Sequence, residues 1–179
     1  MNAFIFTFVL LFFSVVGDVL LSGCGFILPL SAITIFYLAV SRHSLIVFPL
    51  ACLSGIMLDQ LLLYPYMLGV SFALLMTVCG VLWLINGEFS YGSIPHSMMV
   101  VFLTGIFIIV CYLCGIARNV QILNWSYALK LLLNLGINTV ACFIFTPLLI
   151  KYGDIVAKAL SIEPFSVARV NYIQKRKEL

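Results

Sequence analysis

Long apolar stretches, broken only by short polar separators, constrain this chain more than any other feature of its sequence. Residues 4–16, for example, read FIFTFVLLFFSVV. Of the 179 residues, 64% are hydrophobic and only 8% are charged. A soluble domain carries about 25% charged residues because its surface faces water, and disordered chains are poor in apolar residues. The sequence therefore predicts an integral membrane protein.

Six apolar segments have the length of membrane-spanning helices. One span needs about 20 residues, so six would use about 120 and leave about 60 for loops and a tail. We predict an all-α integral membrane protein whose six transmembrane helices form one compact bundle (residues 1–150), followed by a basic tail (residues 151–179). The expected spans are about 3–21, 24–40, 44–63, 66–85, 97–117 and 127–150.

The distribution of positive charge predicts the orientation of the chain. With six spans, the amino terminus, the turn at Arg42, the loop at Glu88 and the tail share one side, which carries seven of the nine Lys and Arg residues. The other side carries Arg118 and Lys130. Because Lys and Arg are enriched in cytoplasmic loops, both termini are expected in the cytoplasm. A lipoprotein-like box at residues 21–24 is set aside, since residues 1–20 lack the basic leader of a signal peptide.

Polar residues inside the spans need an explanation, because a charged side chain near the middle of a membrane helix costs about 2.5–3.5 kcal/mol on insertion scales. Asp18, Asp59, Arg118 and Lys130 all fall near the predicted outer side. We expect Asp59 to meet Lys130 or Arg118, with the Asn134 amide nearby. The alternative is that these residues hold the helices together without any ligand or proton.

The sixth span carries polar residues at every fourth position, and steps of four on a helix turn by only about 40°. These residues are Ser126, Lys130, Asn134, Asn138, Cys142 and Thr146. Hydrocarbon offers such a ridge no hydrogen-bond partners, so it should face the bundle interior or another protein.

Small residues in the third and fourth spans indicate close helix packing. Ala51 and Gly55 are four residues apart, as are Gly69, Ala73 and Thr77. Small residues at this spacing let another helix backbone approach closely.

Reactive groups in catalytic arrangements do not appear in the sequence. We find no nucleophile with a base, no glycine-rich phosphate loop and no paired catalytic carboxylates. Cys111-x-x-Cys114 has the spacing of a metal site, but it lacks the second pair of ligands that zinc usually needs. We therefore predict no enzymatic activity, no cofactor, no metal and no nucleic-acid partner.

Several of these residues resemble those of the MreD family, the bacterial rod shape-determining membrane proteins. Pro29 enters an apolar helix that ends near Arg42, and Gly55-Ile56-Met57-Leu58-Asp59 comes late in the third span. Gly69 opens the fourth span, and Pro147 precedes the basic tail. The turn between Asp59 and Gly69 is about two residues longer than is usual in the family.

The resemblance implies a non-catalytic component of the bacterial inner membrane, in the complex that elongates the peptidoglycan sidewall and controls cell shape. Partners implied by the resemblance are MreC, the glycosyltransferase RodA and a class B penicillin-binding protein, and indirectly the actin-like MreB, besides membrane lipid. The family is also similar to the substrate-binding subunits of energy-coupling-factor vitamin transporters, which share a six-helix fold. A vitamin-binding subunit is therefore the alternative, with Asp59, Lys130 and Asn134 as candidate pocket residues.

Overall fold

Six α-helices make up the part of the chain that the computed structural model describes, namely residues 2–23, 30–41, 44–61, 68–86, 96–117 and 125–162. The helices are α1 (Asn2–Gly23), α2 (Leu30–Ser41), α3 (Ser44–Leu61), α4 (Leu68–Asn86), α5 (His96–Ala117) and α6 (Trp125–Ala159). The all-helical class and the six predicted segments are thus confirmed. Each helix comes from an apolar run, which hydrocarbon favours as helix because all backbone hydrogen bonds then close within the segment.

Three of these helices, α1, α5 and α6, are long and apolar enough to cross a membrane, and α2, α3 and α4 contain shorter apolar stretches. Their composition indicates a membrane protein. The longest helix, α6, has 35 residues. With a rise of about 1.5 Å per residue, a helix of that length extends over about 52 Å, which is more than a hydrocarbon core of about 30 Å.

Helix α6 ends at Ala159, beyond the expected boundary at residue 150. The apolar run ends at Lys151, Asp154 and Lys158, but the helix continues. Lys is a good helix former, and the backbone hydrogen bonds of a helix do not require contact with lipid. The first part of the predicted tail is therefore helical. Residues 163–179 lie outside the described part of the chain.

Helix α2 forms the centre of the fold. Every side chain from Ser31 to Val40 is buried, and α2 contacts each of the other five helices. A helix that is apolar on all sides is the expected occupant of such a position. Helix α4 approaches it closely at Gly80, where a Cβ would lie 2.6 Å from the Ala39 Cβ of α2.

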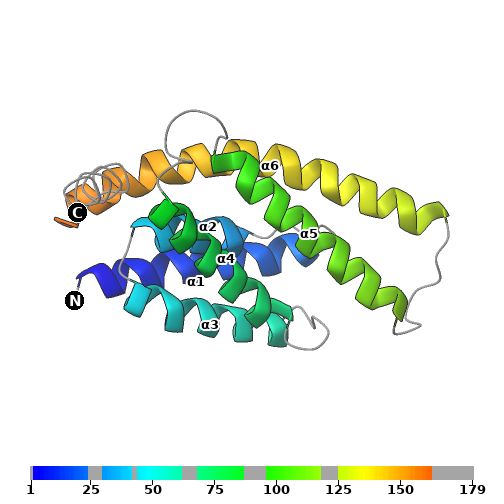
Figure 1. Ribbon diagram of the computed structural model, residues 1–179, viewed down its shortest axis with the longest axis horizontal. Helices are drawn as coiled ribbons and strands as arrows, with labels where there is room; N and C mark the ends of the chain where they lie inside the picture. The colour runs from blue at the N-terminus through cyan, green and yellow to red at the C-terminus, as the bar shows by residue number, and fades with distance from the viewer. Residues whose placement is uncertain are drawn as a thin grey trace.

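The helices do not all have the same neighbours. Helices α1, α2, α3 and α4 pack as one group, whereas α5 and α6 form an antiparallel pair that extends past one end of that group (Figure 1). The amino end of α1 and the carboxyl end of α6 lie at the same end of the molecule (Figure 1). The expected single compact bundle is thus better described as a four-helix group with a longer helical pair across it.

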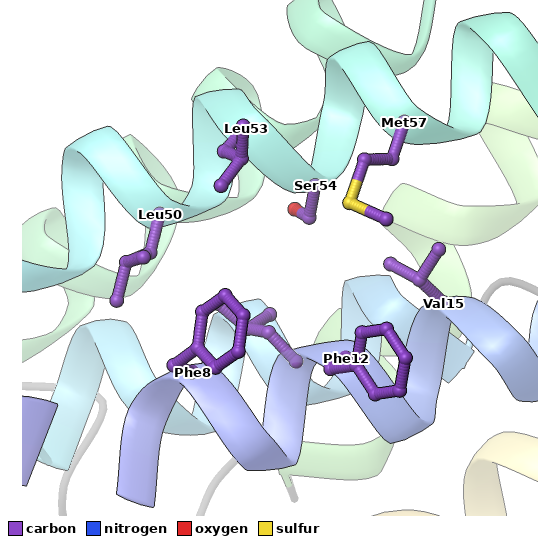
Figure 2. Close-up of a pocket in the computed structure, with 8 residues that line it drawn as sticks. Phe8, Phe12, Val15, Leu50, Leu53, Ser54 and Met57 are labelled. Carbon is purple, nitrogen blue, oxygen red and sulfur yellow. The ribbon is translucent and has the colours of Figure 1, made fainter. Parts of the chain in front are cut away.

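Helices α1 and α3 pack with little free space between them. Phe8, Phe12 and Val15 of α1 face Leu50 and Met57 of α3 (Figure 2). The gap between them measures about 20 Å³, which is close to the room that a single water molecule needs. This contact is therefore a helix interface rather than a binding site.

Candidate functional site: polar locks between helices

Asp59, near the carboxyl end of α3, binds the amino end of α4. The Gly69 amide donates to Asp59 Oδ1 at 2.7 Å, and the Val70 amide donates to Oδ2 at 3.3 Å. These are the second and third residues of α4, and amides at such positions have no partner within their own helix. The carboxylate takes the role of an N-cap side chain, and its negative charge lies at the positive end of the helix dipole.

Next to this cap the backbones of α3 and α4 touch. A Cβ on Gly55 would lie 2.7 Å from the Gly69 carbonyl oxygen, and a Cβ on Gly69 would lie 2.7 Å from the Gly55 carbonyl oxygen. Only glycine fits on both sides of such a crossing. Gly55, Asp59 and Gly69 together form what we call the α3–α4 lock, in which the two glycines bring the helices together and the aspartate holds the start of α4.

Asp18 on α1 has the same role toward α2. The Leu30 amide donates to Asp18 Oδ1 and the Ser31 amide to Oδ2 at 3.0 Å. Asp18 is 4% exposed, so nearly all of its hydration is replaced by these contacts. We call this arrangement the α1–α2 lock. Two successive helical hairpins thus use one device, an aspartate of the first helix that caps the second.

The expected ion pair between Asp59 and Lys130 is wrong. Both Asp59 oxygens accept backbone amides of α4, whereas the Lys130 side chain is exposed near the start of α6, and no salt bridge joins the two. Arg118, the other expected partner, lies outside the described residues, as does Pro29. Backbone amides at the start of a helix stabilise a carboxylate, and those of Gly69 and Val70 do so for Asp59.

The polar ridge of α6 faces α5 along its central part. Asn134 Nδ2 donates to the Tyr112 hydroxyl at 2.6 Å and to the Lys130 carbonyl at 3.1 Å. One turn further along α6, Asn138 Nδ2 donates to Thr104 Oγ1 at 2.9 Å. The expected interior orientation of these asparagines is thus confirmed, and the partner is a hydrogen-bonded face of α5.

The remaining ridge positions divide between the interface and the surface. Cys142 is buried, and its Sγ donates to Asn138 Oδ1 at 3.5 Å. Thr146 is also buried, whereas Ser126 and Lys130 at the start of α6 are exposed. The buried centre of the ridge, with Asn134, Asn138 and Cys142, therefore covers about two turns of α6.

A further polar contact joins α2 to α6 and was not predicted. The Tyr37 hydroxyl donates to Asp154 Oδ1 at 3.3 Å, and a Cβ on Gly153 would lie 2.7 Å from that same hydroxyl oxygen. The tyrosine ring of α2 therefore lies directly against the α6 backbone. The sequence signal for this contact was the adjacent pair Gly153 and Asp154, which follows the last apolar run.

Tyr112 and Thr104 were also missed, although a signal was present. They are eight residues apart on α5, so they lie within about 80° of each other around the helix. A search for a polar stripe on α5 opposite the ridge of α6 would have found them. Among the other predicted packing residues, Ala73 is buried on α4 and Pro147 lies inside α6.

The chemistry of these groups is that of helix association. Asp18 and Asp59 bind backbone amides, and Asn134 and Asn138 bind hydroxyl or carbonyl oxygens, so these groups form hydrogen bonds inside the protein. The fold and these contacts define a helical membrane protein whose intramembrane polar residues join helix to helix. Comparisons with protein-family models, with curated proteins and with solved structures find no match for this chain.

Proposed function

We propose that this chain is a non-catalytic scaffold of the bacterial inner membrane, with both termini in the cytoplasm, that acts in sidewall peptidoglycan elongation and so in cell shape. The proposal rests on the resemblance to the MreD family together with the structural role of the residues that carry it. Its partners would be an MreC-like protein, RodA and a class B penicillin-binding protein.

The observation that carries the proposal is the α3–α4 lock. Gly55 and Asp59 begin and end the segment that resembles the MreD family in the third span. Both contact Gly69, which also belongs to the resemblance. The motif thus fixes the geometry between two helices. A scaffold depends on such fixed geometry. A vitamin-binding subunit would instead need polar groups that converge on a small-molecule pocket, and the Asp59 oxygens are directed at α4 amides.

The outer faces of α5 and α6 support a role in lateral association. Large apolar side chains there are exposed, among them Phe102 (68%) on α5 and Leu132 (64%) on α6. Figure 1 shows this pair reaching beyond the other helices. Helices of partner proteins could pack against these faces in the membrane.

Depletion of the chain from the bacterium that encodes it tests the proposal. We expect rod cells to widen and round, and incorporation of labelled precursor into the sidewall to fall, with recovery when the wild-type chain is supplied. A chain with Asp59→Ala and Gly55→Leu together should restore neither, although the membrane still contains it.

Unchanged cell shape and wall growth, accompanied by loss of vitamin uptake, would overturn the proposal in favour of the transporter subunit. Co-purification separates the two functions biochemically. A scaffold should bring down wall-synthesis proteins, and a vitamin-binding subunit should bring down an ATPase module.

A further inference from the structure

An apolar groove lies between α1, α2 and the second half of α6. Its volume is about 400 Å³, which is typical of small-molecule sites. Leu10 and Phe13 of α1, Ile33 of α2, and Phe145 and Leu148 of α6 contribute to its walls. The Ser14 and Thr34 hydroxyls, which also line it, are 2.6 Å apart and bonded to each other, so they leave the groove mainly apolar.

The position of the groove along the membrane follows from the charges of α6. Lys130 and Lys151 enclose an apolar stretch without a charged residue. Their separation in the sequence corresponds to about 32 Å along a helix, and a hydrocarbon core is about 30 Å thick, so the two ammonium groups fall at its opposite boundaries. Tyr152 lines the groove and directly follows Lys151, so one end of the groove lies at the boundary that Lys151 marks.

Positive charge gathers at this end of the groove. Lys151 is exposed, and its Nζ lies 5.9 Å from the centre of the Tyr152 ring, which lines the groove. Lys158, also exposed, follows seven residues later and so lies on nearly the same face of α6. Asp154, the acidic residue nearby on α6, accepts the Tyr37 hydroxyl.

We propose that this groove binds one anionic phospholipid, with an acyl chain along Phe13, Ile33 and Leu148 and the phosphate beside Lys151. The occupant follows from the combination of an apolar groove at hydrocarbon depth with ammonium groups where lipid phosphates lie. The groove shares Leu30 with the α1–α2 lock, but none of its lining residues belongs to the α3–α4 lock or to the α5–α6 contacts. It therefore does not depend on the proposed role in wall growth.

Lipid titration of the purified full-length chain in detergent, followed by native mass spectrometry, tests this inference. Phosphatidylglycerol should form a saturable one-to-one complex, whereas phosphatidylcholine should bind more weakly. Because one Lys near lipid phosphates contributes about 1 kcal/mol, Lys151→Gln should weaken phosphatidylglycerol binding about fivefold. Lys130→Gln, which removes the same charge at the other end of the apolar stretch, should leave it unchanged.

A second pair of variants tests the groove itself. Leu148→Trp should fill it and reduce phosphatidylglycerol binding, whereas Leu129→Trp, at an exposed position outside the groove, should not. Equal losses for Lys151→Gln and Lys130→Gln would overturn the proposal, since they indicate a general attraction of lipid to charge. Equal binding of both lipids by the wild-type chain would overturn it too.

Discussion

At the scale of single residues, the two aspartates of the spans matter through the backbone amides that they accept. Asp59 accepts the Gly69 and Val70 amides, and Asp18 accepts those of Leu30 and Ser31. In water, loose amides at a helix start would bind solvent. In hydrocarbon these amides have no water to bind. A capping carboxylate therefore fixes the position of the helix start, and the amides in turn stabilise the carboxylate.

Replacement of Asp59 should measure this contribution. We expect Asp59→Ala to lower the free energy of unfolding by about 1–2 kcal/mol, the range of a lost helix cap. Asp59→Asn, which keeps one acceptor oxygen, should cost less. Unfolding of the purified chain by denaturant in mixed micelles gives both values.

Lys130→Gln is the matched control for the charge. The Lys130 side chain is exposed and makes no ion pair with Asp59. Like other surface substitutions, this change should therefore alter the free energy of unfolding by less than about 0.5 kcal/mol. A loss as large as that of Asp59→Ala would mean that the two residues act together after all.

Glycine substitutions should separate the tight crossing from ordinary helix positions. A Cβ at position 55 would lie 2.7 Å from the α4 backbone. That backbone must move away in Gly55→Ala, so we expect a loss of about 2–3 kcal/mol in the free energy of unfolding.

Gly136→Ala is the control for the crossing, because a Cβ there meets nothing within 4 Å. This change should be neutral or stabilising by up to about 1 kcal/mol, since Ala is the better helix former. The same unfolding assay compares the two variants, and equal effects would contradict the close approach of α3 and α4.

At the scale of elements, α5 and α6 are joined by hydrogen bonds between side chains, whereas Asp18 and Asp59 bind backbone amides of the next helix. Asn138 and Thr104 form the buried centre of the α5–α6 contact, with Cys142 on the adjacent turn. Hydrogen bonds between membrane helices average about 0.6 kcal/mol and reach about 1.7 kcal/mol. Several such hydrogen bonds are therefore needed to hold α5 against α6 where this pair extends beyond the other helices.

A double-mutant cycle should detect this coupling. Asn138→Ala and Thr104→Ala, alone and combined, are expected to give a coupling energy of about 0.6–1.7 kcal/mol in the unfolding assay. The pair Asn138→Ala and Thr77→Ala serves as the control, since Thr77 on α4 donates within its own helix to the Ala73 carbonyl. Additive effects in the first cycle would exclude a direct bond.

Helix positions were largely predictable from the sequence, whereas polar partners were not. Apolar runs mark helices because lipid demands internal hydrogen bonding. In the described residues this placed the six segments to within a few residues, apart from the end of α6. The expected start of the second span at residue 24 lies outside the described residues. For Asp59, the sequence suggested side-chain partners, namely the cations Lys130 or Arg118 with the Asn134 amide nearby. The true partners, the Gly69 and Val70 amides, carry no side-chain signal, and the tight Gly55 crossing that brings them near depends on the three-dimensional arrangement.

At the scale of the whole molecule, the ends of the helices give a testable topology. The start of α1 and the end of α6 lie at the same end of the structure, as an even number of crossings requires (Figure 1). Lys130 and Lys151 mark opposite ends of the uncharged part of α6.

Single cysteines at these two positions should react from opposite sides of the membrane. In a chain whose six natural cysteines are replaced, we expect Lys130→Cys to react with an impermeant maleimide added outside intact spheroplasts. Lys151→Cys should react only in inverted vesicles. Reaction of both from one side would contradict the passage of α6 through the bilayer.

The repeated aspartate cap also bears on biosynthesis. Each carboxylate is translated before the helix start that it will hold, so the first hairpin can close while later segments are still inside the ribosome. Membrane insertion would then proceed by hairpins, with each turn secured as it emerges. Arrest-peptide force profiles should show a pulling event soon after Ser31 leaves the translocon, and Asp18→Ala should abolish it.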